Sequence, residues 1–326
     1  MSGEREGDPL RECWEQHDAV FLDHYLVQEV ENPTINPQSV LVRALLADAL
    51  EPDRHTDLIA GELLYAACAS TLLLAARENW WDDLANAVAS GEAEAERVPA
   101  FMRPLVAGDP APFSLPDLVA RLGKALAGGF SDLASPFEDR WRDALATPAG
   151  PQRAAALELA CGSANDARFF ARYGLADRLD FTGIDIAEKN IANARARCPE
   201  ARFVRGDVAA MPFADAAFRF VIAFDLFEHL APDVLERALA EAVRVCAPGG
   251  DLYLSFFNAD WIGAHDIRPV GNYHSNALSL DRLADSLAAL GCQSYVIDLP
   301  EEWRTQFPGY RHYNPEARII VARRGD

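Results

Sequence analysis

Acidic side chains interrupt or follow three short apolar runs in the second half of the chain. Glu158 lies inside the first run, Asp185 follows the second and Asp207 follows the third. A carboxylate inside an apolar segment is costly without a partner, and a ligand ammonium group would be such a partner for Glu158. A carboxylate in the position of Asp185 can accept from both hydroxyls of a ribose, and Asp207 beside Val208 offers an acceptor and an apolar wall to an adenine. Each acid alone is more often a helix cap or a solvated loop residue, but three in succession indicate a nucleoside site.

The segment that follows Glu158 is rich in small residues. Ala160, Gly162 and Ala164 allow the backbone to turn tightly and to approach a ligand closely. The turn precedes a predicted helix, whose free amides favour polar ligand groups. A nicotinamide dinucleotide is the main alternative ligand, but its G-x-G-x-x-G fingerprint requires glycine where this chain has Asn165.

Short apolar runs alternate with helical patterns from residue 155 onward. The alternation predicts an α/β fold with a doubly wound, mostly parallel sheet of seven strands. The last two strands follow each other without a helix between them, so they form a hairpin and the last strand runs antiparallel. The expected strands are 155–160, 179–184, 201–204, 218–224, 252–256, 294–297 and 318–321, and the expected helices are 166–173, 187–196, 234–245 and 280–290.

The first part of the chain shows helical patterns and no strand alternation. Apolar stretches cover Val40 to Leu50 and Leu58 to Ala76. The cluster Thr147-Pro148-Ala149-Gly150-Pro151 is rich in residues that break regular structure. We therefore expect an all-helical domain at 1–148, as a cap or an oligomerisation domain, and a ligand-binding domain at 149–326.

Composition narrows the class of partner. The formal net charge of −20 over 326 residues repels phosphate backbones and anionic lipid surfaces, so we expect no nucleic acid and no membrane partner. The apolar run Leu58 to Ala76 is interrupted by Glu62 and predicts a buried helix rather than a membrane span. The six cysteines form no C-x-x-C pair, and the start of the chain has no basic-then-apolar signal. Free thiols of this kind predict a cytoplasmic protein.

Five motifs in a fixed order give the segment from about Ala155 to Val321 a family resemblance. The segment resembles class I S-adenosylmethionine-dependent methyltransferases, most closely the group that includes ubiquinone and menaquinone biosynthesis methyltransferases. Ala160 and Ala164 depart from the family pattern, which has glycine at both positions, and leave less room in the turn. The matching motifs are Glu158 to Ala164, Asp185, Gly206-Asp207-Val208 with Met211-Pro212-Phe213, Phe227-Glu228-His229 and Ala247-Pro248-Gly249-Gly250.

The resemblance implies S-adenosylmethionine as the cofactor and places its methionyl end. Glu158 would neighbour the methionine ammonium, and the turn from Ala160 to Ala164 would follow the methionyl part. Phe224 and Asp225 would lie near the sulfonium.

The resemblance also assigns residues to the adenosine end. Asp185 would hold the ribose hydroxyls and Ile186 would pack on the adenine. Asp207 would accept from the adenine amino group, with Val208 beside the ring.

Ligands of an open parallel sheet bind beyond the carboxyl ends of its strands, and three loops of this chain reach that edge. These loops are 225–231, 257–277 and 300–316. The two longer loops are rich in aromatic and imidazole groups, which suit a ligand pocket. We expect them to wall the methyl acceptor, with the N-terminal helices as a lid. The expected substrate contacts are Trp261, His265, Tyr273 and Tyr310.

A histidine near neutral pKa suits the base that an oxygen acceptor needs. His229 and His274 are the catalytic candidates, although a structural role at a helix start is favoured over catalysis for His229. Asp225, Glu228 and His229 also resemble the ligand set of certain metal-dependent family members. Aspartate replaces the first glutamate of that set, and we expect no metal.

The function that these features favour is methyl transfer to an oxygen or nitrogen atom of a small molecule, in specialised metabolism. A protein or peptide methyltransferase and a non-catalytic, cofactor-binding assembly subunit are the alternatives. An exposed groove would favour the first alternative, and the intact acids Asp185 and Asp207 oppose the second. A homodimer is compatible with the helical first part.

Overall fold

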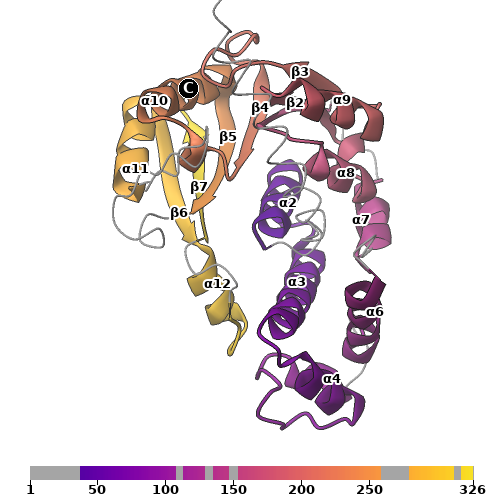
Figure 1. The fold of residues 1–326 in the computed structure, drawn as a ribbon. Coiled ribbons are helices and arrows are strands. Elements are labelled where there is room, and N and C mark those ends of the chain that lie inside the picture. The colour runs from indigo at the N-terminus through magenta and orange to yellow at the C-terminus, as the bar shows by residue number, and fades with distance from the viewer. Residues whose placement is uncertain are drawn as a thin grey trace, which may run out of the picture.

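The computed structural model describes residues 37–107, 113–128, 135–146, 153–257, 279–311 and 317–325. Figure 1 shows a twisted sheet at one end of the molecule and helices that extend from it. The sheet has the strand order β3-β2-β1-β4-β5-β7-β6. Its strands are β1 (Ala154–Leu159), β2 (Leu179–Asp185), β3 (Arg202–Arg205), β4 (Phe218–Phe224), β5 (Cys246–Phe257), β6 (Cys292–Asp298) and β7 (Ala317–Arg324).

The pairing confirms the expected fold class. Strands β1 to β5 pair in parallel, and β7 pairs antiparallel with both β5 and β6. Strand β7 therefore lies between β5 and β6, and β6 forms the edge of the sheet. Because the connections between parallel strands return over the sheet, the carboxyl ends of β1, β2 and β4 meet at one edge.

Two hydrophobic cores lie on the two faces of the sheet. Neighbouring strand residues point to opposite faces, so Phe220 belongs to one core and Val221 to the other. The first core also contains apolar side chains of the N-terminal helices, so that helical part shares a core with the sheet. Among the described residues, the helices between β1 and β6 are α8 (Asn165–Arg172), α9 (Glu188–Arg197), α10 (Pro232–Val245) and α11 (Leu280–Ala289), together with two short 3-10 helices.

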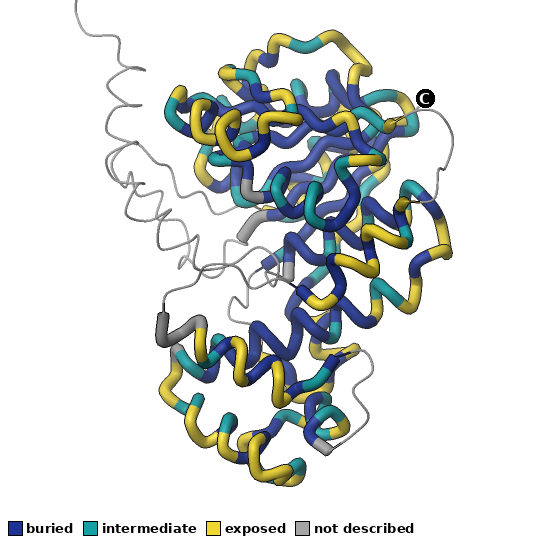
Figure 2. The backbone as a smooth tube through the Cα atoms, turned by 90° about the vertical axis from the view of Figure 1, so that its right-hand side faces the viewer, coloured by how far each residue is buried: buried dark blue, intermediate teal, exposed yellow. Residues whose placement is uncertain are grey.

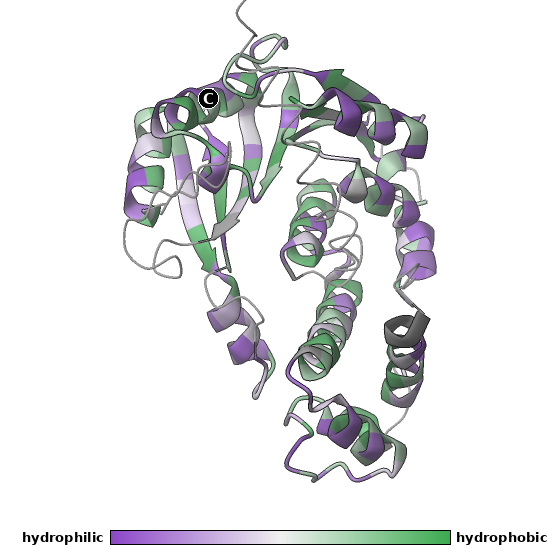
Figure 3. Ribbon diagram, viewed as in Figure 1, coloured by the Kyte–Doolittle hydropathy of each residue, from purple (hydrophilic) through white to green (hydrophobic). Residues whose placement is uncertain are grey.

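The N-terminal part is helical, as its sequence predicts. Its helices are α2 (Pro37–Leu50), α3 (Thr56–Arg77), α4 (Trp81–Ala89), α5 (Arg103–Ala107), α6 (Leu115–Gly128) and α7 (Glu138–Leu145). By length and apolar composition α3 could cross a membrane, but 72% of its most apolar window is buried inside the protein. Figures 2 and 3 show the corresponding buried, apolar course of this helix.

The expectation of an open loop at 300–316 is wrong for its first half. Helix α12 (Leu299–Gln306) connects β6 to β7. Asp298 caps it by accepting from the backbone N–H of Glu301 at 3.0 Å, and Pro300 occupies the first turn. A capping aspartate followed by proline is a helix-start signal, and the aromatic content of the segment concealed it.

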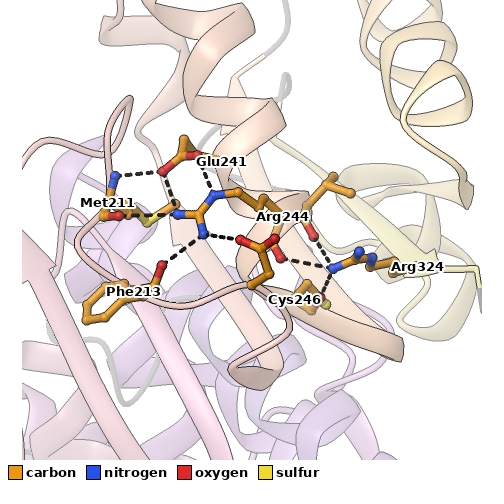
Figure 4. A network of polar contacts seen from close by, with 8 residues as sticks. Met211, Phe213, Glu241, Arg244, Cys246 and Arg324 are labelled. Carbon is orange, nitrogen blue, oxygen red and sulfur yellow. Dashed lines mark hydrogen bonds and ion pairs between the residues drawn. The ribbon is translucent and has the colours of Figure 1, made fainter.

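A polar network holds the turn 211–213 against α10 (Figure 4). Arg244 donates to the carbonyl oxygens of Met211 and Phe213, and Glu241 accepts from the backbone N–H of Met211 at 2.7 Å. Arg324 of β7 donates to carbonyl oxygens at the end of α10, including that of Val243 at 3.0 Å. A cation at this position satisfies acceptors that have no partner within the helix. The Met211-Pro212-Phe213 motif is thereby fixed against α10.

Candidate functional site

The turn between β1 and α8 has an unusual backbone. Ala160, Gly162 and Ala164 have φ angles of 53°, 52° and 66°, in the left-handed region. Two alanines therefore adopt a conformation that favours glycine. The backbone N–H of Cys161 donates to the carbonyl of Ile184 at 3.0 Å, which ties the turn to β2.

Asp185 anchors the same turn from the end of β2. Its Oδ2 accepts from the backbone N–H of Gly162 at 2.9 Å, and its Oδ1 accepts from the N–H of Ala187 at 2.8 Å. The side-chain amide of Asn190 donates to Oδ1 at 3.2 Å. A carboxylate has about four acceptor positions, so Asp185 is already committed to the local backbone. Its contact with a ribose stays a prediction.

Glu158 and Asp166 are buried carboxyl groups with unused acceptor atoms. Glu158 is 4% exposed and Asp166 is 9% exposed. Within the described residues, Glu158 Oε2 and Asp166 Oδ1 have no hydrogen-bond partner. Burial raises the pKa of Glu158 well above its usual value, and the nearby Asp166 and Asp185 raise it further. Burial also raises the pKa of Asp166 to about 6, against the opposing influence of Arg43 and Ser39.

Asp225 stands at the end of β4, beside this pair. Its φ of 47° is again left-handed, and its Oδ1 accepts from Ser255 Oγ at 3.2 Å and from Gln38 Nε2 at 3.5 Å. Burial raises the pKa of Asp225 to about 7, and the charge of Asp166 contributes. A carboxyl group with this pKa changes its charge near neutral pH.

The predicted adenosine contacts lie along the adjoining strand ends. Ile186 is half-buried after β2, Asp207 is exposed after β3 and Val208 is buried next to it. Asp207 Oδ1 accepts from the backbone N–H of Ala209 at 2.8 Å, which orders the loop. Phe224, predicted near the sulfonium, is half-buried at the end of β4. The structure thus brings the cofactor candidates to one sheet edge, and their individual roles stay predictions.

The catalytic and substrate candidates are described only in part. His229 is exposed in a short 3-10 helix, Phe227–His229. His274, Trp261, His265 and Tyr273 lie outside the described residues. The roles of all these residues stay predictions, as does the absence of a metal. In the described ranges, no group of three His, Cys, Asp or Glu residues could hold a metal ion.

Tyr310 is 2% exposed, in a cluster of side chains between α12 and the N-terminal helices. Its hydroxyl lies 3.2 Å from Ser70 Oγ, and its ring packs against Trp303 at a centroid distance of 5.3 Å. The pair Arg311 and Glu78 joins the same two parts of the chain at 2.9 Å. These contacts dock α12 on the helical part, and a substrate contact of Tyr310 stays a prediction.

Helix α2 also reaches the sheet edge, which the sequence analysis missed. Gln38 contacts Asp225, and Ser39 hydrogen-bonds to Asp166. Arg43 lies one turn further along α2 and is 2% exposed. A charged residue inside the apolar stretch Val40 to Leu50 was the available signal, since such a residue requires a buried partner.

Comparisons with known proteins agree with this arrangement. Residues 156–250 match the family model of a methyltransferase domain. A protein of Mycolicibacterium smegmatis named as an S-adenosylmethionine-dependent methyltransferase is 30% identical over 41% of this chain and 50% of its own length. The demethylmenaquinone methyltransferase of Renibacterium salmoninarum is 33% identical over 38% of this chain and 50% of its own length. The chain thus spans about half the length of these curated relatives.

Further similarity covers a smaller share of the chain or has a lower identity. A phthiotriol/phenolphthiotriol dimycocerosates methyltransferase of Mycobacterium tuberculosis is 36% identical over 29% of this chain and 34% of its own length. The structure of a TehB-like S-adenosylmethionine-dependent methyltransferase from Corynebacterium glutamicum is similar at a TM-score of 0.41. It is 19% identical and covers 64% of this chain and 97% of its own.

Proposed function

Because residues 156–250 belong to a methyltransferase domain of the class I S-adenosylmethionine-dependent type, we propose that the chain transfers a methyl group to an oxygen or nitrogen atom of a small molecule. The observation that carries this proposal is the buried carboxyl pair Glu158 and Asp166, each with an acceptor atom that no described residue uses. Buried acceptor atoms without a partner are costly. A cationic ligand at the sheet edge would stabilise both.

The residues at this edge fit S-adenosylmethionine. Glu158 would hold its ammonium group, the turn Ala160 to Ala164 its methionyl part and Asp185 its ribose. Asp207 and Val208 would hold the adenine. The bound cofactor supplies a methyl group on a positively charged sulfur, ready for attack by an acceptor lone pair.

The task of the chain is then to place the acceptor in line with that methyl and to take up a proton. Positioning alone can supply much of the acceleration. His229 and His274 are the proposed bases, and Asp225 joins them because its pKa of about 7 suits proton transfer near neutral pH. The acceptor pocket is proposed to include Trp261, His265, Tyr273 and Tyr310.

Charge and relatives support a small acceptor. A net charge of −20 opposes binding to polyanions. The relatives are named for a demethylmenaquinone and for phthiotriol dimycocerosates, which are small molecules or lipids rather than polymers. Specialised metabolism in the cytoplasm is the setting that we propose.

The test has two stages. Calorimetry with S-adenosylmethionine measures cofactor binding, and a library of phenols, quinols, hydroxylated lipids and amines is then screened for release of S-adenosylhomocysteine. Methylation that depends on one acceptor class supports the proposal. A protein that binds no S-adenosylmethionine would contradict it, and binding with methylation of peptides alone would favour the peptide alternative.

A further inference from the structure

Two polar side chains at the start of α2 are buried toward the sheet edge. Gln38 is 1% exposed and Ser39 is 5% exposed. The amide of Gln38 donates to Asp225 at 3.5 Å, and Ser39 hydrogen-bonds to Asp166. Buried polar groups are retained where they satisfy specific partners. The partners here are two acids of the proposed cofactor site.

Arg43 fixes α2 in this position. Its guanidinium forms an ion pair with Glu62 of α3 at 3.0 Å and lies 4.6 Å from the centre of the Tyr173 ring, just beyond α8. Glu62 also accepts from the indole N–H of Trp141 in α7 at 2.8 Å. Helix α2 is thus in contact with α3 and with the end of α8 through Arg43, and Glu62 of α3 in turn binds α7. The expectation that the N-terminal helices form a lid stays a prediction.

The charges around Asp166 lack a matching cation. Asp166 faces Arg43 and Ser39 of α2, and it also interacts electrostatically with Glu158 and Asp225. Asp185 adds a further negative charge next to Glu158. Arg43 interacts with Asp166 but also forms an ion pair with Glu62, so one guanidinium is shared between two carboxyl groups. Glu158 Oε2 and Asp166 Oδ1 can each still accept a hydrogen bond from a positively charged ligand group.

We propose that α2 forms one wall of the cofactor site, where Ser39 and Arg43 hold the Asp166 carboxylate toward the cationic methionyl end of the cofactor. This inference rests on the proposed function, because it takes S-adenosylmethionine as the ligand. Asp166 is then a further binding residue, and Ser39 is a positioning residue that acts through it. The N-terminal helical part contributes to cofactor selection as well as to the fold.

Two ligands and a double-mutant cycle test this role. S-adenosylmethionine carries the sulfonium and ammonium charges, whereas 5′-methylthioadenosine shares its adenosine but carries neither charge. Asp166→Asn keeps the shape of the side chain and should weaken binding of S-adenosylmethionine by roughly ten-fold or more. Binding of 5′-methylthioadenosine should be unchanged. Ser39→Ala should weaken S-adenosylmethionine severalfold in the wild-type background and have no further effect in Asp166→Asn, because both changes act on one carboxylate.

Ser70→Ala is the matched control, since Ser70 is also a buried serine of an N-terminal helix. It should leave the affinities for both ligands unchanged. Equal losses for the two ligands, or additive effects of Ser39→Ala and Asp166→Asn, would indicate general distortion and overturn the inference. Unchanged S-adenosylmethionine affinity in both variants would overturn it as well. A wild-type protein that binds neither ligand would instead contradict the proposed function, so calorimetry on the five proteins (wild type, the two single variants, the double variant and Ser70→Ala) separates the two failures.

Discussion

The side-chain amide of Gln38 donates to the carboxylate of Asp225 at 3.5 Å, across 187 positions of the chain. Gln38 lies in the first turn of α2, the first described helix, and Asp225 follows β4, at the edge where the cofactor motifs converge. The contact therefore joins the helical part to the strand that resemblance places beside the sulfonium. The pKa of Asp225 therefore depends on a contact with the helical part as well as on its own surroundings in the sheet.

This charge should be visible in the pH dependence of stability. Burial raises the pKa of Asp225 from 3.8 to about 7, so the folded chain binds this proton more tightly than the unfolded chain. The resulting stabilisation is present below the unfolded pKa and is lost as the pH rises through the folded pKa. Asp166, with a pKa raised to about 6, acts in the same direction. The contribution of these two carboxyl groups to the melting temperature of the cofactor-free protein should therefore fall as the pH rises from about 4 to about 7.

Asp225→Asn should remove part of that fall and raise the melting temperature at about pH 8 more than at about pH 5. Thermal unfolding across this range is the measurement. Asp233→Asn, at an exposed position of α10, should leave the slope as in the wild type. An Asp225→Asn profile parallel to the wild-type profile would show that this carboxyl group keeps its ordinary pKa.

Asp185→Ala should damage cofactor binding and stability together. The substitution removes the acceptor for the N–H groups of Gly162 and Ala187, and each hydrogen bond to a charged group contributes roughly 1.5–3 kcal/mol. We expect S-adenosylmethionine affinity to fall by at least about ten-fold, with a lower free energy of unfolding. Calorimetry and chemical denaturation measure the two effects. Asp180→Ala, at an exposed position of the same strand, should change neither, and full affinity in a folded Asp185→Ala protein would remove Asp185 from the site.

The turn that Asp185 holds shows where sequence patterns were sufficient and where they were not. The small residues at 160, 162 and 164 predicted a tight turn, and the structure gives all three left-handed backbones. Apolar runs placed the strands well because each is a buried segment bounded by polar residues; β4 matches its expected limits, 218–224. Such patterns involve residues that are close in the sequence, so the turn and the strands can be predicted from the sequence alone.

The contacts of α2 with the site are not local. Nothing near Gln38 indicates that Asp225 lies opposite, because their proximity results from packing of the helical part on the sheet. Arg43 gave a partial signal as a charge inside an apolar helix, but its partner Glu62 is equally buried and was read as an interruption of α3. Helix α12 was missed for a different reason, since its capping signals stand beside aromatic residues that suggested a binding loop.

Ala160→Gly should stabilise the protein. A left-handed backbone costs an L-residue roughly 1–2 kcal/mol, whereas glycine loses about 0.5–1 kcal/mol through the entropy of the unfolded chain. The side chain of Ala160 is only half-buried, so little packing is lost and a gain of about 0.5–1 kcal/mol is expected in chemical denaturation. Ala164→Gly should gain less, because its methyl group is fully buried. Ala155 is half-buried in β1 and has an ordinary backbone conformation, so Ala155→Gly should destabilise the protein. An equal loss of stability in Ala160→Gly would mean that the turn carries no strain.

The last prediction concerns the ion pair that holds α2. Arg43 and Glu62 are 2% and 1% exposed and lie 3.0 Å apart. Replacing one partner leaves a buried charge, which typically costs about 3–5 kcal/mol, so Arg43→Met should strongly lower the free energy of unfolding. Adding Glu62→Gln should recover part of this loss, because the amide is neutral and its oxygen can still accept from Trp141.

Arg97→Met is the control for this prediction. The side chains of Arg97 and Asp83 are 58% and 64% exposed, and their charged atoms lie 3.8 Å apart. Exposed pairs of this kind contribute about 1 kcal/mol or less. Chemical denaturation of the four proteins measures these differences. If Arg43→Met lost no more than Arg97→Met, α2 would be held by its apolar face alone, and the buried charge would have no part in fixing the wall of the site.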